Sequence, residues 1–148
     1  MKFSTRTIYG LKAILVLAGR YGEGLLSVSS IAKKESISVH YLEQILNALK
    51  KKGLVKSVRG PQGGYALAQK PSEISLEKLF YALESHPSPK HTAQADTDET
   101  VIANALFWHK LASSIEKGLS QVTLKELLDE SRRLKKTKQR SPAPTFHI

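Results

Sequence analysis

Four polar side chains capable of hydrogen bonding to DNA bases recur at helical spacing in the first half of the chain. They are His40, Glu43, Gln44 and Asn47, at positions i, i+3, i+4 and i+7. Glutamine can form two hydrogen bonds with adenine, and glutamate can accept one from cytosine. An apolar stripe with the same spacing lies on the opposite side of the predicted helix: Leu42, Ile45, Leu46 and Leu49. If the apolar side packs on a core, the polar side faces outward, either as a base-reading surface or as an ordinary solvated face.

The residues before this stripe predict a shorter helix and a tight turn. Ser27 is placed to cap a short helix that carries Ile31 on its apolar side. The longer helix is expected to begin after Ser38 and to end at Gly53, and only residues 36–37 separate the two helices. This arrangement is typical of a helix-turn-helix, whose second helix enters the major groove of DNA.

A β-hairpin with a glycine-rich loop is predicted directly after the second helix. Residues 54–58 and 65–68 have strand character, and residues 59–64 read RGPQGG between them. Glycines let the backbone approach another surface and leave N–H groups free for phosphates, while Arg59 can enter a narrow minor groove. The loop lacks the GK[ST] of a nucleotide-binding P-loop and does not open onto a helix. The candidate DNA-binding residues are therefore Ser38, His40, Tyr41, Glu43, Gln44, Asn47, Lys56, Arg59, Gly60, Gln62, Gly63 and Gly64.

An apolar stripe with alternating steps of four and three residues runs through a long helix predicted from Val101. Its members are Val101, Ala105, Trp108, Ala112, Ile115 and Leu119, and it is widened by Ile102, Leu106 and Leu111. A helix this apolar on more than one side needs two covering surfaces, its own domain and a partner chain. We therefore expect a homodimer with the six stripe residues at its interface, and we expect Trp108 to be a core residue rather than a ligand platform.

Two further helices frame the predicted DNA-binding region. The first is expected from Ser4 to Tyr21, because apolar residues recur there at three- and four-residue steps. The fourth is expected to open at Ser75 and to be terminated by Pro87 and Pro89.

The rest of the chain predicts a loop, a short helix and a tail. Thr123 and Glu126 have the spacing of a capping box, which opens a last short helix. The fold class is therefore mainly α with a small β-hairpin wing. The expected organisation is a winged helix-turn-helix domain at 1–85, a loop or hinge at 86–100, dimerisation helices at 101–131 and a basic flexible tail at 132–148.

Charge is distributed unevenly along the 148 residues. The net charge is +10, from 23 Lys and Arg against 13 Asp and Glu. Residues 1–70 carry 12 basic and 3 acidic side chains, residues 71–131 carry 5 and 10, and residues 132–148 carry 6 and none. A basic half beside an acidic middle favours a polyanionic partner for the basic half, with double-stranded DNA as the leading candidate and a merely solvated basic surface as the alternative.

Composition excludes several other classes of protein. The sequence contains no cysteine, so disulfides, thiolate nucleophiles and cysteine-ligated metal centres are excluded. The longest apolar run, residues 13–18, is far shorter than the ~20 residues of a membrane span. Basic residues flank this run and no cleavage site follows it, so we expect a cytoplasmic protein that does not enter a membrane.

The two most specific stretches resemble a known bacterial family. Residues 4–18, with Tyr9, form one of them; the other, from Ser38 onward, reads S-x-x-YLEQIL-x-x-L-x-x-x-GLV-x-SVRGPxGGYxLA. This pattern resembles the winged helix-turn-helix regulators of the IscR, NsrR and CymR (Rrf) family. The resemblance covers the chain up to about residue 130. Within the family, the chain is most similar to the cysteine-metabolism repressors. The resemblance implies a repressor that binds an inverted repeat as a homodimer, with Glu43 and Gln44 at base-reading positions and Arg59 as the wing arginine.

The resemblance also bears on cofactors. Several members hold an iron–sulfur cluster through three cysteines in the loop before the long helix, whereas this loop has none, and Asn104 occupies a position where a histidine ligand can stand. A cluster-free member with no cofactor is therefore expected. The loop also contains four groups that could bind a metal, with His109 able to approach: His86, His91, Asp96 and Asp98. Their spacing follows no known metal template, so solvated histidines are the preferred interpretation.

Two other functions remain as alternatives to a DNA-binding regulator. A winged-helix adaptor for proteins does not explain the basic half with its outward Gln and Glu stripe. The second alternative is a metal-dependent hydrolase. Its ligands would be His86, His91 and the acidic cluster at residues 96–99. Such an enzyme needs its ligands on rigid elements, whereas these residues lie in a predicted loop. We therefore expect a protein without enzymatic activity.

The last residues, PAPTFHI, predict a partner-binding segment at Phe146, His147 and Ile148. Backbone N–H groups can capture a terminal isoleucine carboxylate. The ending resembles the tails with which serine acetyltransferase and the cysteine-metabolism repressor engage cysteine synthase, so cysteine synthase is a predicted partner. The alternatives are a tail that folds back onto the domain and a small-molecule signal bound between the wing and the dimerisation region.

Overall fold

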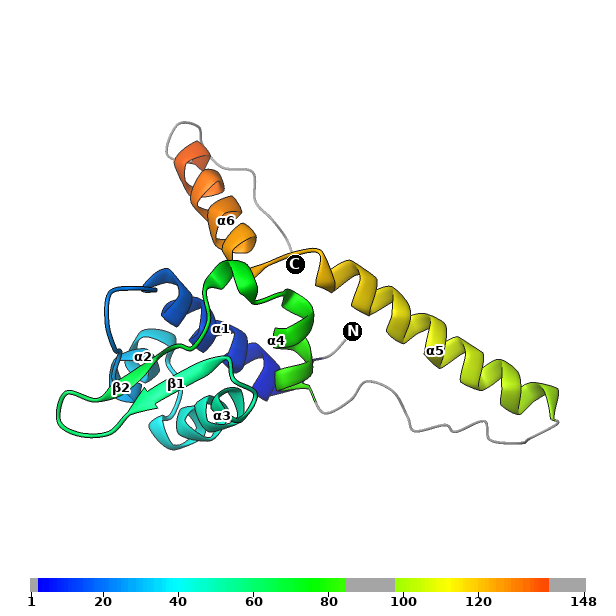
Figure 1. Cartoon of the computed structure of the whole chain (residues 1–148), viewed down its shortest axis with the longest axis horizontal. Coiled ribbons are helices and arrows are strands. Elements are labelled where there is room, and N and C mark those ends of the chain that lie inside the picture. The colour runs from blue at the N-terminus through cyan, green and yellow to red at the C-terminus, as the bar shows by residue number, and fades with distance from the viewer. Residues whose placement is uncertain (1–2, 85–97, 139–148) are drawn as a thin grey trace.

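In the computed structural model, the described residues are 3–84 and 98–138, and they form a helical protein with one hairpin (Figure 1). In chain order the elements are α1 (Thr5–Gly19), α2 (Val28–Glu35), α3 (Val39–Lys51), β1 (Val55–Val58), β2 (Gly64–Leu67), the 3-10 helix η1 (Pro71–Glu73), α4 (Leu76–Leu83), α5 (Glu99–Ser120) and α6 (Leu124–Lys138). The predicted fold class, mainly α with a hairpin wing, is confirmed. No described helix is long and apolar enough to cross a membrane.

Serine hydroxyls begin the first four helices. The caps are Ser4, Ser27, Ser38 and Ser75, which accept hydrogen bonds from the backbone N–H groups of Thr7, Ser30, Tyr41 and Lys78. Each cap satisfies an N–H group that has no partner inside the helix, which favours helix formation at that residue. The predicted starts of α2, α3 and α4 are therefore confirmed.

Two helix ends differ from the prediction. α1 ends at Gly19 rather than at Tyr21, because Arg20 leaves the helical conformation (φ −112°, ψ 18°). α4 ends at Leu83, where Glu84 becomes extended, so neither Pro87 nor Pro89 is needed to end it. Both prolines lie outside the described residues.

The turn between α2 and α3 is as short as predicted. Ser36 adopts a left-handed conformation (φ 56°, ψ 46°), and the N–H of Ile37 donates back to the carbonyl of Ala32 over 3.0 Å. This left-handed residue ends α2 and redirects the chain into the Ser38 cap. The helix-turn-helix is confirmed (Figure 1).

The core lies beneath α3 and is shared by helices from both ends of the chain. Fully buried side chains come from α1, α3, the segment after η1, and α6: Ile14, Leu42, Leu46, Leu49, Ile74 and Leu124. The predicted apolar stripe of α3 is therefore its inner side, and burial of these leucines holds α3 in one rotational setting.

β1 and β2 form the predicted antiparallel hairpin, extended on one side by a bridge from the segment before α2. Val55 pairs with Leu67 and Val58 with Gly64, while Leu26 exchanges two backbone hydrogen bonds with Tyr65 (2.7 and 2.9 Å). Figure 1 shows the connection between α1 and α2 running beside the hairpin. The root of the wing is thus anchored to the body.

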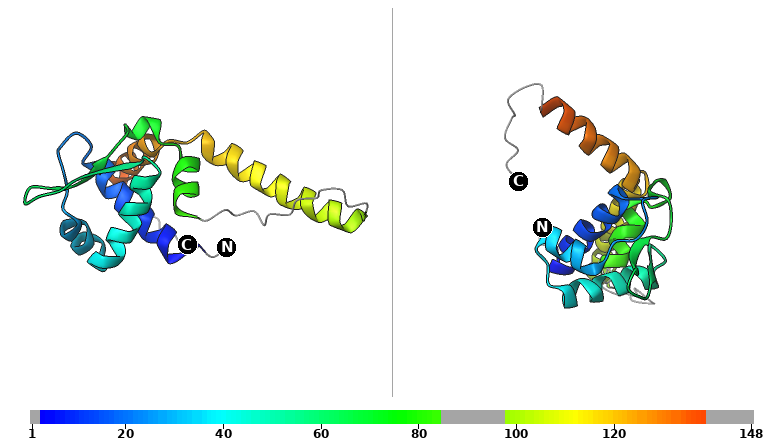
Figure 2. Two further views of the ribbon diagram at one scale, coloured as in Figure 1. Left: turned by 60° about the horizontal axis from the view of Figure 1, so that its bottom comes forward. Right: turned by 90° about the vertical axis from the view of Figure 1, so that its left-hand side faces the viewer.

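α5 extends away from the helices around α3 (Figure 1 and Figure 2). It begins at Glu99, two residues before the predicted Val101, because the side chain of Asp98 caps it by accepting from the N–H of Thr100. None of its residues is buried. A 22-residue helix with so little cover from its own chain exposes apolar side chains to solvent.

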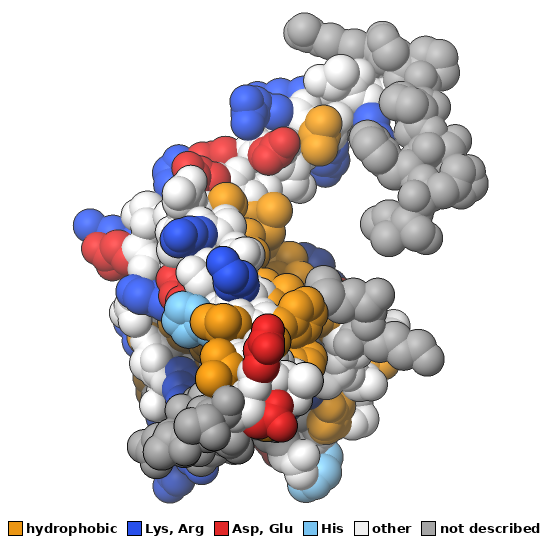
Figure 3. Space-filling model, turned by 90° about the vertical axis from the view of Figure 1, so that its right-hand side faces the viewer, with side chains coloured by type: hydrophobic (Ala, Val, Ile, Leu, Met, Phe, Trp, Pro, Cys, Tyr) orange, Lys and Arg blue, Asp and Glu red, His pale blue; other side chains and the backbone are white. Residues whose placement is uncertain are grey.

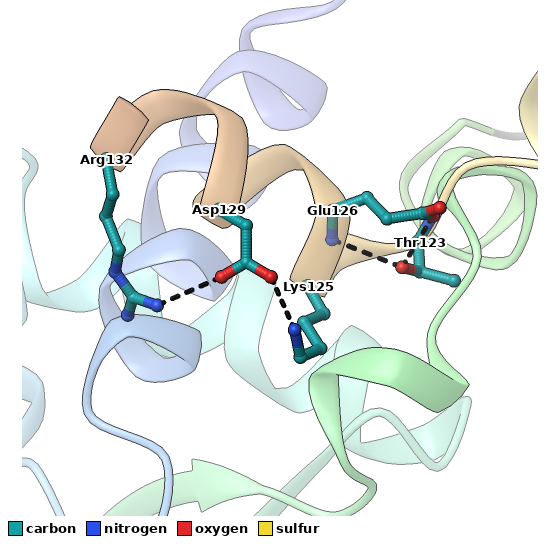
Figure 4. Close-up of polar contacts among 5 residues, drawn as sticks. All are labelled: Thr123, Lys125, Glu126, Asp129 and Arg132. Atoms are coloured by element: carbon teal, nitrogen blue, oxygen red, sulfur yellow. Dashed lines mark hydrogen bonds and ion pairs between the residues drawn. The ribbon is translucent and has the colours of Figure 1, made fainter. Parts of the chain in front are cut away.

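α6 opens with the predicted capping box and is longer than expected. Thr123 and Glu126 exchange backbone-to-side-chain hydrogen bonds of 2.7 and 3.2 Å (Figure 4). The helix then continues to Lys138, so the prediction of a flexible tail from Arg132 is wrong for residues 132–138. Asp129 pairs with Lys125 at i−4 and with Arg132 at i+3, and such pairs support a helix across this point. Residues 139–148, which include the predicted partner-binding segment, lie outside the described residues.

Candidate nucleic-acid interface

The four candidate base-reading side chains of α3 share its outer face. His40, Glu43, Gln44 and Asn47 are all exposed, on the side opposite the buried leucines. Gln44 Nε2 donates a hydrogen bond to His40 Nε2 over 3.1 Å. This bond limits the rotamers of Gln44 before any ligand arrives, and a preordered side chain loses less entropy when it binds.

Ser38 and Tyr41 have structural roles within this region. Ser38 caps α3, and the half-buried Tyr41 ring packs edge-on against Tyr9 of α1, with ring centroids 6.0 Å apart. Both residues therefore fix the start of α3 on the body. Their predicted contacts with DNA stay predictions.

A hydrogen bond links the candidate reading helix to the wing. Lys50 Nζ, in the last turn of α3, donates to Ser57 Oγ on β1 over 2.6 Å. Sequence reasoning missed Lys50, although it lies three residues after Asn47 and continues the outer stripe by nearly one turn. α3 and the hairpin are thus held side by side, as a joint surface requires.

The wing tip is open to solvent, but two of its glycines serve the hairpin itself. Arg59, Gly60 and Gln62 are exposed, and Gly60 has a left-handed φ of 118°. A Cβ on Gly63 would lie 2.2 Å from the carbonyl oxygen of Val58, and one on Gly64 would lie 2.4 Å from that of Leu26. The expectation that these glycines mainly permit approach to DNA is therefore incomplete, because the fold already requires both.

The six predicted interface residues of α5 are not its most exposed apolar side chains. Val101 is exposed, whereas five are half-buried: Ala105, Trp108, Ala112, Ile115 and Leu119. Leu106, Phe107 and Leu111 are more open to solvent than any of the six, and Ile102 is as exposed as Val101. Phe107, at 58% exposure, was not identified from the sequence because it falls outside the heptad stripe, although its i+4 spacing to Leu111 was a usable signal.

A second apolar surface lies where α5 leaves the body. A groove of about 240 Å³ there is lined by side chains of α1, α4, α5 and α6, including Ile8, Leu11, Phe80, Leu83, Leu119 and Leu127. Figure 3, viewed from the side towards which α5 extends, shows hydrophobic side chains gathered in the middle of this face. Groove and helix together form a large uncovered apolar surface.

The described residues offer no metal site. They contain no group of three or more His, Asp or Glu that could hold an ion. Asp98 caps α5, and Asn104 Oδ1 accepts a hydrogen bond from the indole of Trp108 over 3.1 Å. His86, His91 and Asp96 lie outside the described residues, so the hydrolase hypothesis gains no support from the part of the chain that is described.

Comparison with known proteins decides the family. The profile of the Rrf2 family, described as an iron-dependent transcriptional regulator, matches residues 3–130. This chain is a transcriptional regulator of the Rrf2 family. CymR of Bacillus subtilis (strain 168), a helix-turn-helix-type transcriptional regulator, is 38% identical over 127 residues, which cover 86% of this chain and 89% of CymR.

Solved structures agree with this assignment. The structure of B. subtilis CymR matches the Rrf2 regulator with a TM-score of 0.70 at 35% identity, covering 88% of this chain and 98% of that one. The T. potens IscR structure matches with a TM-score of 0.72 at 35% identity, covering 98% and 94%. The recognised resemblance is therefore confirmed.

The residues of this Rrf2 regulator do not fit an iron–sulfur cluster. Such clusters are held mainly by cysteine thiolates, and the chain has no cysteine. The side chain of Asn104, where a histidine ligand can stand in the family, is occupied by its hydrogen bond to Trp108.

Proposed function

We propose that this Rrf2 regulator binds an inverted-repeat operator as a homodimer and represses transcription from the adjoining promoter. The observation that carries the proposal is the outer face of α3, where four base-reading side chain types are exposed and their backbone is fixed by buried leucines. A helix placed this way can enter the major groove with Gln44 and Glu43 towards base edges. The relatives, which are transcriptional regulators, favour this function over the adaptor and the hydrolase.

The wing supplies the second part of the proposed contact. Arg59 extends from the exposed tip, and the Lys50–Ser57 hydrogen bond holds the strand leading to it beside α3. With α3 in the major groove, the tip reaches the adjoining minor groove, where an arginine is attracted by the negative potential. Lys56 and the loop backbone contact phosphates, which position the protein without reading sequence.

The homodimer is supported by the uncovered apolar surface of α5. Leu106, Phe107 and Leu111 are each more than 40% exposed, on a helix that has no buried residue. A second copy related by a two-fold axis covers this surface and presents a second α3 in inverted orientation. The symmetry of the dimer then sets the symmetry of the operator.

Selection of bound sequences from random DNA tests the proposal directly. We expect enrichment of two half-sites in inverted orientation, about one helical turn apart. Enrichment of a single half-site would contradict the dimeric mode of binding. Absence of any enriched sequence would contradict base reading by α3.

The finer proposal is that the target genes belong to cysteine metabolism. Its support is the relationship to CymR, whose structure is described as that of the global cysteine regulator of B. subtilis. Transcripts of cysteine-synthesis genes are expected to rise when the gene for this regulator is deleted. A fall in these transcripts would indicate an activator, and unchanged transcripts would contradict the proposed pathway.

Binding of cysteine synthase through Phe146, His147 and Ile148 stays a prediction. It is tested by comparing the binding of cysteine synthase to the full chain and to an Ile148 deletion.

A further inference from the structure

A cavity lies beside the hairpin and is lined by both of its strands and by the connection between α1 and α2. Its volume is about 450 Å³, within the range of roughly 300–1,000 Å³ that small-molecule sites occupy. Its walls come from α1, from residues 20–22 and 24–26, and from both strands of the hairpin. Apolar side chains make up most of the lining: Leu17, Leu25, Leu26, Val58, Ala66 and Leu67.

Two cations and no carboxylate line this cavity. Arg20 and Lys56 both border it, whereas Glu23, which pairs with Arg20, does not. Within residues 3–84 and 98–138, the ammonium group of Lys56 has no hydrogen-bond or ion-pair partner. An apolar chamber with positive charge at its border is complementary to a ligand that has an apolar body and one negative group.

The cavity wall also carries apolar surface that the chain leaves uncovered. Val58 is 53% exposed and Tyr21 is 47% exposed, and both line the cavity. After Tyr21 the connection passes through Gly22 and Gly24, whose φ angles of 84° and 97° are left-handed. A Cβ at either glycine would meet no atom within 4 Å, so these glycines are needed for their conformation, which sets the course of this wall.

The position of the cavity ties it to the wing. Lys56 and Val58 lie two residues apart on β1, so both point to the same face of the hairpin, and Arg59 follows Val58 directly. Ser57 points to the other face, where it accepts the hydrogen bond from Lys50 of α3. A ligand in the cavity therefore contacts the strand that carries the wing arginine, from the face opposite α3.

We infer that this cavity binds a small organic carboxylate with an apolar body, whose negative group pairs with Arg20 and Lys56. Binding covers Val58 and Tyr21 and takes up the charge of Lys56. If the proposed DNA contact of Lys56 is correct, the occupied regulator loses one phosphate contact at the wing and holds its operator less tightly. The ligand site itself does not depend on that contact, whereas its effect on DNA does.

Matched probes can test the site on the full chain. We would titrate ¹⁵N-labelled protein with 2-naphthoate and with 2-naphthamide, which share an apolar body and differ in charge. The carboxylate is expected to shift the amide signals of Gly22, Gly24 and Val58 and to bind about fivefold more tightly than the amide. Three outcomes would overturn the inference. The first is that none of these signals shifts at millimolar concentrations of the probe, and the second is that the two probes bind with equal affinity. The third is that only the signals of Ile8 and Leu119, in the other groove, shift.

Variants separate the charge from the apolar chamber. Arg20→Gln, which removes one of the two cations, should weaken the binding of 2-naphthoate about twofold and leave that of 2-naphthamide unchanged. Ala66→Leu fills the chamber and should weaken both probes, and Lys34→Gln, an exposed cation on α2, should change neither. If Arg20→Gln and Lys34→Gln lowered the affinity for 2-naphthoate equally, the effect would be one of general charge only, and the proposed site would be wrong.

Operator binding measured with and without 2-naphthoate tests the link to the wing. The probe should weaken the operator complex and lower the salt dependence of its affinity by about one phosphate contact. If the probe fills the cavity and the affinity for DNA does not change, the proposed effect of the ligand on the wing is wrong, whereas the ligand site itself stands. Failure to bind any operator would instead overturn the proposed function, while the probe titration would still decide the cavity.

Discussion

The hydroxyl of Tyr81 on α4 donates a hydrogen bond to Glu116 Oε1 on α5 over 2.8 Å. This hydrogen bond to Glu116 favours the protonated phenol, and together with partial burial and the negative charge of Glu116 it raises the pKa of Tyr81 to about 12. This bond joins the body that carries α3 to the helix that carries the proposed dimer surface. The direction of α5 relative to α3, and so the spacing of two α3 helices in a dimer, depends in part on this contact.

Replacing Glu116 should change the titration of Tyr81. The pKa of Tyr81 in the folded protein is raised above the usual value of about 10. The hydrogen bond therefore makes its full contribution to the free energy of unfolding below pH 10, and this contribution disappears as the pH rises through about 12. In Glu116→Gln the pKa of Tyr81 is expected to fall towards 10, as followed by carbon-13 NMR of the phenol ring. Glu99→Gln, at the far end of α5, is the matched control and should leave it unchanged. Identical titration curves in Glu116→Gln and the parent protein would contradict the hydrogen bond.

Acid should weaken the junction between α1 and α4. Glu84 accepts hydrogen bonds from the Thr7 hydroxyl and from the N–H and hydroxyl of Ser4, and these bonds lower its pKa. A lowered folded pKa contributes stability above the unfolded value of about 4.5, and this stability is lost as the pH falls through the folded pKa. Glu84→Gln should therefore cost about 1 kcal/mol of unfolding free energy at pH 7 and less near pH 3. Unfolding of the parent protein and the variant by denaturant at both pH values measures this difference in unfolding free energy. An equal difference at the two pH values would show that the charge of Glu84 is not involved.

The DNA-binding half could be predicted well because its signals are local. Ser27, Ser38 and Ser75 cap helices by bonds to residues three positions away, so sequence spacing alone locates the helix starts. The outer stripe of α3 follows in the same way from the positions of its buried leucines. These features need no knowledge of distant contacts.

Other features depend on contacts that spacing does not reveal. The need for Gly64 comes from its approach to Leu26, which lies 38 residues earlier in the chain. The cavity beside the wing likewise joins residues from α1 and β1. The length of α6 was underestimated because the cluster of cations after Arg132 was interpreted as a solvated tail, although Lys and Arg are good helix formers. The exposure of Phe107 follows from the direction in which α5 leaves the body.

Charge placed on the exposed side of α5 should separate the dimer. Phe107→Asp combined with Leu111→Asp puts two carboxylates into the proposed interface and leaves Leu119, which lines the groove against the body, unchanged. Sedimentation should show monomers, and operator affinity should fall at least about a hundredfold because two half-sites are no longer bound together. His109→Asp, an exposed residue on the side of the helix opposite Phe107 and Leu111, is the control and should stay dimeric. A parent protein that is monomeric at micromolar concentration would contradict the dimer.

Removal of iron should not affect this regulator, although its family is described as iron-dependent. With no cysteine in the chain, no thiolate exists to hold a cluster. The purified protein should be colourless, and a chelator should leave its operator affinity unchanged. Iron analysis and the visible absorption spectrum measure the first expectation. A reproducible visible band with one or more equivalents of iron would contradict it.

Base reading and phosphate anchoring should be separable between α3 and the wing. Gln44 is exposed on the outer face of α3 and ordered by His40, so Gln44→Ala should cost about 1–3 kcal/mol on the best operator and flatten the sequence preference. Lys56 offers only charge, so Lys56→Gln should weaken specific and random DNA alike and lower the salt slope by about 1. Lys34→Gln removes the same charge from α2 and controls for the general field of the protein. Fluorescence anisotropy on both kinds of DNA at several salt concentrations distinguishes the two roles. If Gln44→Ala weakened both DNAs equally, the outer face of α3 would serve as a phosphate contact rather than a reader of bases.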